Sequence, residues 1–231
     1  MCIRRGIDKV AHNSGLEMHP NLNNPRPNAI EQDQSLNTTK TLPHDYEHYH
    51  ALNLSNWKLM LITNAAGIIL LFLFGWLFIG LAAALNPTFF TLEISFLAQT
   101  LTLQVFFLTI LLVVILHEVC HAIFFWLFTH ERPKIGFNLL YAYAAAPDWH
   151  FPRNKFILIG LAPFLLITLG GVIWLFGADF LMIPRLILAL TLNAAGSVGD
   201  LLVMVWLMTQ PANSLVKDEG AQITLFTKAK V

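Results

Sequence analysis

Residues 111–128 read LLVVILHEVCHAIFFWLF, an apolar run with two histidines and a glutamate near its middle. A chain that crosses a bilayer must satisfy its own backbone hydrogen bonds, and an α-helix of about 20 apolar residues does so. One charged side chain at the centre of such a helix costs roughly 2.5–3.5 kcal/mol on insertion scales. Three ionisable residues within five positions therefore need compensation, and a shared metal ion would provide it.

The composition of the whole chain supports a membrane protein. Of its 231 residues, 56% are hydrophobic and 12% are charged, whereas soluble domains average about 45–50% and about 25%. The formal net charge is zero, which gives no reason to expect a nucleic-acid partner. Cys2 lies in a polar segment and Cys120 in an apolar one, so a disulfide framework is not expected.

Four apolar blocks are long enough to cross a bilayer as helices. They cover residues 57–85, 101–128, 156–176 and 180–208. We therefore expect an all-α membrane protein with about four transmembrane helices. Its predicted parts are a flexible tail at 1–56, a membrane domain at 57–210 and a C-terminal tail at 211–231.

The basic residues predict how the chain is oriented. Of its 14 lysines and arginines, all but Arg185 fall in residues 4–58, 132–155 and 217–230, on one side of the predicted membrane domain. Lysine and arginine gather in cytoplasmic loops. We expect a multi-pass protein of the cell membrane with both termini in the cytoplasm.

The ionisable residues of the second block form an H-E-x-x-H pattern, with His117, Glu118 and His121. Residues four apart share one face of a helix, so the two imidazoles can bind one metal ion while Glu118 holds a water on it. Zn²⁺ suits such a site, and it lowers the pKa of its bound water to about 7. The pattern alone also occurs by chance, and the three side chains could instead hydrogen-bond to other helices.

Asp200 is the candidate for a third zinc ligand, because it is the other carboxylate well inside an apolar block. Counted from the predicted cytoplasmic ends of their helices, Asp200 and the two histidines all lie roughly 14–20 Å deep. The other interpretation is a solvated aspartate in an interior cavity.

Asn193, Gly196, Ser197 and Asp200 follow a helical spacing that places them on one face. Asn193 could hydrogen-bond the substrate or the developing oxyanion. Equally, Asn193 and Ser197 could serve only as hydrogen-bonding residues between helices.

His117, Glu118 and His121 on one membrane helix, with Asn193 and Asp200 on a later one, resemble the zincin peptidase family of small multi-pass bacterial membrane proteins. That family is similar to the site-2 intramembrane metalloproteases. The resemblance implies His117, His121 and Asp200 as zinc ligands, Glu118 as catalytic base and the bacterial inner membrane as location. Site-2 proteases usually carry Asn-x-x-Pro before an Asp-Gly pair; here Gly196 replaces the proline and Leu201 follows Asp200.

Two further segments have two interpretations each. Residues 135–143 contain strand formers and could bind an extended substrate by strand addition, or they form an ordinary interfacial loop. Residues 44–50 read HDYEHYH; this run could bind a metal ion or be a solvated segment.

The leading hypothesis is a membrane-embedded zinc endopeptidase that cleaves membrane or membrane-associated proteins. The alternative is a zinc-binding membrane protein without catalysis, such as a transporter or scaffold. A haem protein is disfavoured, because His117 and His121 project from one face of one helix and cannot clamp a haem from both sides. A serine protease based on Ser197 is weaker still. The oligomeric state does not follow from the sequence.

Overall fold

Long apolar helices make up most of the chain. The structure is a computed structural model that describes residues 37–86, 94–137, 142–220 and 222–229, and its contacts group residues 36–231 into one unit. Three helices are long and apolar enough to cross a membrane: α1 (Trp57–Leu85), α3 (Leu103–Thr129) and α4 (Arg153–Leu175). A short helix that the sequence did not predict, α2 (Ile94–Thr100), precedes α3.

The fourth predicted block forms two helices rather than one. These are α5 (Ile183–Gly196) and α6 (Val198–Met208), bent by 43° at their junction. Counted as one span, the pair brings the candidate transmembrane helices to four. The bend follows from Ser197, whose hydroxyl donates to the carbonyl of Asn193 at 2.8 Å, a type of bond that bends helices.

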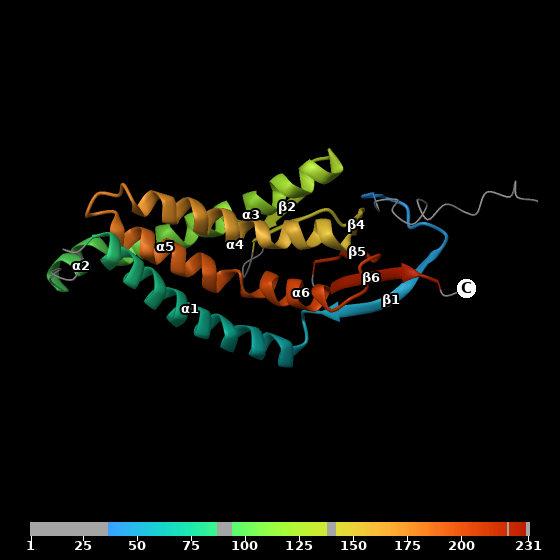
Figure 1. The fold of residues 1–231 in the computed structure, drawn as a ribbon, viewed down its shortest axis with the longest axis horizontal. Coiled ribbons are helices and arrows are strands. Elements are labelled where there is room, and N and C mark those ends of the chain that lie inside the picture. Colours follow the sequence, from blue (N-terminus) through green and yellow to red (C-terminus); the bar gives the residue numbers. More distant parts are fainter. Residues whose placement is uncertain (1–36, 87–93, 138–141, 221, 230–231) are drawn as a thin grey trace, which may run out of the picture. The chain divides into compact units, whose positions relative to one another are not determined.

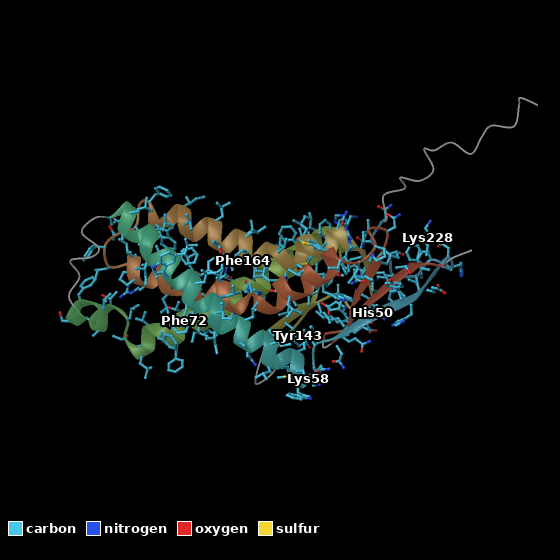
Figure 2. The ribbon with its side chains drawn as sticks, turned by 60° about the horizontal axis from the view of Figure 1, so that its bottom comes forward. His50, Lys58, Phe72, Tyr143, Phe164 and Lys228 are labelled. Atoms are coloured by element: carbon cyan, nitrogen blue, oxygen red, sulfur yellow. The ribbon has the colours of Figure 1, made fainter. Side chains whose placement is uncertain are left out.

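The helices pack through a shared apolar core and leave large apolar side chains on the outside. One cluster of buried residues joins α1, α4 and α5 through Phe78, Leu175 and Leu190. On the outer surface of α1, Phe72 is 72% exposed and Trp76 is 75% exposed (Figure 2 labels Phe72). Exposed apolar surface of this kind suits lipid and not water, so the chain is a mostly helical membrane protein.

A four-stranded antiparallel sheet lies at one end of the helices (Figure 1). Its strands are β1 (Tyr46–Asn53), β4 (His150–Pro152), β5 (Leu215–Asp218) and β6 (Gln222–Lys228). Their spatial order is β1-β6-β5-β4. The sheet thus joins a segment before α1 to a segment before α4 and to the C-terminal segment.

This sheet corrects two predictions. The chain is not all-α, because residues 46–53, 215–218 and 222–228 are paired strands. The first of these strands lies in the predicted flexible N-terminal tail, and the other two lie in the predicted C-terminal tail. The cause is burial. Leu215, Val216 and Leu225 are fully buried, and Val216 and Leu225 belong to a core cluster that includes residues of α3, α4 and α6. One strand needs only three or four apolar residues for burial. A longer segment that contains such a strand therefore has a polar average composition, and the strand is overlooked. Residues 1–36 of the predicted tail lie outside the described residues.

A second, two-stranded sheet follows α3. It pairs β2 (Lys134–Phe137) with β3 (Ala142–Ala145) in antiparallel register. Gly136 lies opposite Tyr143, whose ring occupies the space that a side chain at position 136 would need. The described residues of this segment therefore form strands, while 138–141 lie outside them. Substrate binding by strand addition stays a prediction.

Candidate metal centre

The two histidines of the motif lie one turn apart on α3. This helix starts at its N-cap Thr102, whose hydroxyl accepts from the amide of Val105, and ends at His130 in the left-handed conformation with φ of 54°. The rings of His117 and His121 are 4.9 Å apart between centroids and inclined by 74°. Their side chains are 13% and 12% exposed, so both face into the protein.

The bend between α5 and α6 determines where Asp200 lies. Because the first helix ends at Gly196, Asp200 falls in the first turn of α6. Unpaired amides at a helix N-terminus favour a negatively charged side chain. The glycines at 196 and 199 weaken helix formation and so assist the break. Asp200 thereby projects from the start of a new helix toward α3.

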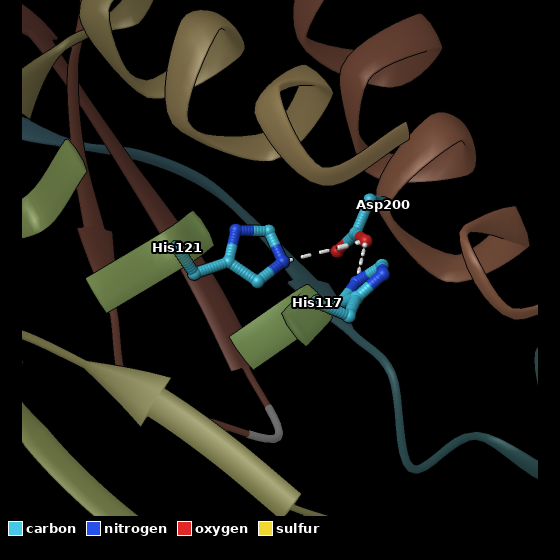
Figure 3. Close-up of side chains that lie close together, drawn as sticks. All are labelled: His117, His121 and Asp200. Carbon is cyan, nitrogen blue, oxygen red and sulfur yellow. Dashed lines mark hydrogen bonds and ion pairs between the residues drawn. The ribbon is translucent and has the colours of Figure 1, made fainter. Parts of the chain in front are cut away.

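His117, His121 and Asp200 converge on one point (Figure 3). The Oδ2 atom of Asp200 lies 2.9 Å from Nε2 of His117 and 3.5 Å from Nε2 of His121. One possible ligand atom from each residue lies within 4.8 Å of the other two. Among the described residues, these three form the group of histidine, cysteine or acidic side chains whose ligand atoms lie close enough together to hold one metal ion.

The donor set fits zinc. Zinc bonds of about 2.0–2.1 Å to nitrogen and oxygen, in tetrahedral arrangement, place neighbouring ligand atoms about 3.3 Å apart. The observed separations of 2.9 and 3.5 Å lie on either side of that value. Three protein ligands are also the number that catalytic zinc sites use, with a fourth position left for water.

Glu118 lies beside this group in a cavity of about 300 Å³. It is half-buried, and the backbone amide of Ala144 on β3 is its hydrogen-bond partner. The carboxylates of Glu118, Asp200 and Asp218 and the two imidazoles line the cavity, and no lysine or arginine is among its described lining residues. A divalent cation would offset this excess of negative charge.

The turn between β5 and β6 adds a residue that the sequence analysis missed. Asp218 lines the cavity, and its Oδ1 accepts from the amide of Gly220 at 2.8 Å. Burial raises the pKa of Asp218 to about 6. Gly220 has φ of 81°, a conformation that glycine adopts without strain. The sequence does predict a hairpin at this point, because a Gly-containing turn lies between two runs of strand-forming residues.

Asn193 does not reach the cavity. Its side chain is fully buried, and its Nδ2 lies 3.4 Å from the hydroxyl of Thr168 on α4. The predicted common face assumed one straight helix, whereas Asn193 lies on α5 and Asp200 on α6, on either side of a 43° bend. The contact with Thr168 is the hydrogen bond between helices that the alternative interpretation expects, while the oxyanion role of Asn193 stays a prediction.

The histidines of the N-terminal run lie on β1 and not in this centre. His48 and His50 are exposed, and the ring of His50 lies 6.2 Å from that of Trp206. Among the residues that the structure describes, they belong to no group with metal-site spacing.

The fold and the site define a class: a helical membrane protein with a candidate metal centre of two histidines and an aspartate, next to a glutamate. Comparison with known families agrees with that class. The family described as "Putative zincin peptidase" matches residues 110–215, and the predicted family resemblance is thereby confirmed.

The match covers α3 from residue 110 onward together with α4, α5 and α6, and so includes every member of the centre. Similarity to site-2 proteases stays a prediction.

Curated proteins and solved structures offer no match to this chain.

Proposed function

We propose that this chain is a membrane-embedded zinc endopeptidase that hydrolyses peptide bonds of membrane or membrane-associated proteins. The observation that carries the proposal is the convergence of His117, His121 and Asp200 in one cavity with Glu118. The family match supports the same chemistry. In this proposal both termini lie on the cytoplasmic side of a cell membrane, as the basic residues predict.

Each residue of the centre has one role in the proposal. His117, His121 and Asp200 hold the zinc ion, which when bound activates a water molecule and polarises the scissile carbonyl. Glu118 is the general base that accepts the proton of that water and later delivers it to the leaving amine. The amide of Ala144 keeps the Glu118 carboxylate directed into the cavity.

The substrate binds as an extended chain along β3. A peptide bond inside a helix is protected by its neighbours, so a protease must bind its substrate unwound. Tyr143 and Ala144 of β3 line the cavity next to Glu118, and β2 pairs with one side of β3. An added strand would give the backbone hydrogen bonds for this binding. Ile135→Pro should disrupt the hairpin and reduce cleavage, whereas unchanged cleavage would argue against strand addition.

The test of the proposed function compares Glu118→Gln with the unmodified protein. Because Glu118 is not a ligand, the variant should retain about one zinc per chain while cleavage is lost. Quantitative membrane proteomics of cells that carry each form should then show uncleaved proteins accumulating only with the variant. The matched control is Glu131→Gln, an exposed carboxylate beyond the end of α3, which should behave as the unmodified protein does.

Two outcomes would reject the peptidase. If Glu118→Gln keeps the full cellular phenotype while His117→Ala removes it, the metal ion is structural and the chain is a non-catalytic zinc-binding membrane protein. If zinc-free preparations function fully, the metal centre itself is refuted.

A further inference from the structure

Helix α4 contains one internal proline, Pro163, one turn after Ile159, which lines the cavity of the metal centre. Proline has no amide hydrogen, so it cannot donate to the carbonyl four residues earlier in a helix, and its ring pushes that carbonyl aside. The carbonyl in question belongs to Ile159. Both residues are fully buried.

A side chain of α3 donates a hydrogen bond to the Ile159 carbonyl in place of the missing amide. Nδ1 of His121 lies 3.1 Å from the carbonyl oxygen of Ile159. A carbonyl oxygen can only accept, so the hydrogen is on Nδ1. In a neutral imidazole the other nitrogen, Nε2, then carries the lone pair. That nitrogen is the one that lies 3.5 Å from Asp200.

The segment that carries this carbonyl also contacts α6. A side chain on Gly160 would come within 2.5 Å of the terminal methyl of Met204. Glycine at this position therefore allows α4 and α6 to approach closely. The helix of Ile159 thus packs against both the helix of the histidines and the helix of Asp200.

We propose that Pro163 is a positioning residue for His121: by lacking an amide hydrogen it leaves the Ile159 carbonyl to orient the imidazole and to select the tautomer that binds zinc through Nε2. The inference rests on the proposed zinc centre for its purpose, but the hydrogen bond between His121 and Ile159 does not itself require a metal ion. Histidine ligands commonly donate their second nitrogen to a carbonyl in this way, and loss of the partner lowers metal affinity about 10–100-fold.

The experiment restores the missing donor. In full-length protein purified in detergent, Pro163→Ala supplies an amide hydrogen to the Ile159 carbonyl. Alanine is the best helix former, so this variant should fold. Its zinc affinity, measured by competition with a chromophoric chelator, should fall about 10–100-fold, and the visible spectrum of the Co²⁺-substituted protein should change.

A second variant separates the amide hydrogen from the shape of the ring. Pro163→lactic acid, which replaces the amide by an ester, has neither ring nor N–H and should restore the zinc affinity and the Co²⁺ spectrum. The matched control is Pro184→Ala, which adds an amide in the first turn of α5, where no earlier helical carbonyl is affected. It should leave the zinc affinity unchanged.

A readout without metal distinguishes this inference from the proposed function. In ¹⁵N-histidine NMR of the metal-free protein at about pH 9, well above the ordinary histidine pKa of about 6.5, His121 should carry its hydrogen on Nδ1. Pro163→Ala should lose this preference and the lactic acid variant should keep it. An unmodified protein that shows this pattern but binds no zinc would refute the zinc centre alone. Unchanged tautomer in Pro163→Ala, or equal effects of alanine and lactic acid, would refute the role of Pro163.

Discussion

Asp200 and His117 are 83 residues apart in the chain, yet Oδ2 of the aspartate lies 2.9 Å from Nε2 of the histidine. The contact joins α6 to α3 inside the apolar part of the protein. Each side chain would be costly to bury alone. Their pairing explains how the two ionisable groups can be accommodated there, and a zinc ion shared with His121 would strengthen the same arrangement.

Asp200→Asn should remove zinc from the protein. The amide keeps the size of the carboxylate but not its charge, and it is a poor ligand for zinc. The affinity should fall by more than the roughly 10–100-fold that loss of an outer hydrogen-bond partner causes. Zinc content of the purified variant checks this, with Asp179→Asn, an exposed residue between α4 and α5, as control. Full zinc occupancy in Asp200→Asn would exclude Asp200 as a ligand.

His150 should make the protein less stable in mild acid. It is 7% exposed on β4, and burial lowers the pKa of its imidazole. The folded state therefore binds a proton less readily than the unfolded state. The stability from neutral His150 is complete above about pH 6.5, the unfolded pKa, and is lost as pH falls below that value.

His150→Phe tests this dependence. The substitution keeps an aromatic ring beside Phe226, whose ring centroid lies 5.3 Å from that of His150, but removes the titrating group. Thermal unfolding midpoints measured from pH 8 to pH 5 should fall less in the variant than in the unmodified protein. Parallel curves for the two proteins would rule out His150 as a source of the acid sensitivity.

Asp200 illustrates how much of the site could be predicted from the sequence. Counting residues from the predicted helix ends placed it at the depth of the histidines, and the structure brings the three together. The count worked because rise per residue is nearly constant in a helix. The apolar blocks likewise predicted the helices well, and the block at 57–85 coincides with α1.

Asp218 and Ser197 illustrate what could not be predicted. The turn after Asp218 is visible in the sequence, but the position of Asp218 also depends on the pairing of its strand β5 with β4, which lies far earlier in the chain. A single sequence carries little information on such pairing. The bend at Ser197 depends on a hydroxyl-to-carbonyl bond within the helix, which average hydropathy does not detect. The same bend divides the predicted common face between two helices, with Asn193 on α5 and Asp200 on α6.

Asp218→Asn should stabilise the metal-free protein at neutral pH. Because burial raises the pKa of Asp218 to about 6, the folded state holds this proton more tightly than the unfolded state does. The resulting stability is complete below about pH 4, the unfolded pKa, and is lost as pH rises through about 6. The effect is up to about 3 kcal/mol, reduced by whatever water reaches this half-buried group.

The measurement is the thermal midpoint of both proteins between pH 4 and pH 8, with metal removed by chelation. The variant should exceed the unmodified protein near pH 8. Glu219→Gln is the control on the same turn, where hydrogen bonding to Lys217 lowers the pKa of Glu219; that change should bring no gain at pH 8. A stability gain that is equal at pH 4 and pH 8 would contradict the role assigned to Asp218.

Leu225→Ala should show that the C-terminal strand is part of the folded domain. Leu225 is fully buried on β6 and belongs to the core cluster that joins the sheet to α3, α4 and α6. Truncating a buried leucine costs about 2–5 kcal/mol, so the thermal midpoint should drop by several degrees and zinc affinity should weaken, because the neighbouring turn lines the cavity. Lys228→Ala, an exposed position on the same strand, should change neither. If Leu225→Ala is as stable as Lys228→Ala, the strand does not contribute to the fold in the way the structure indicates.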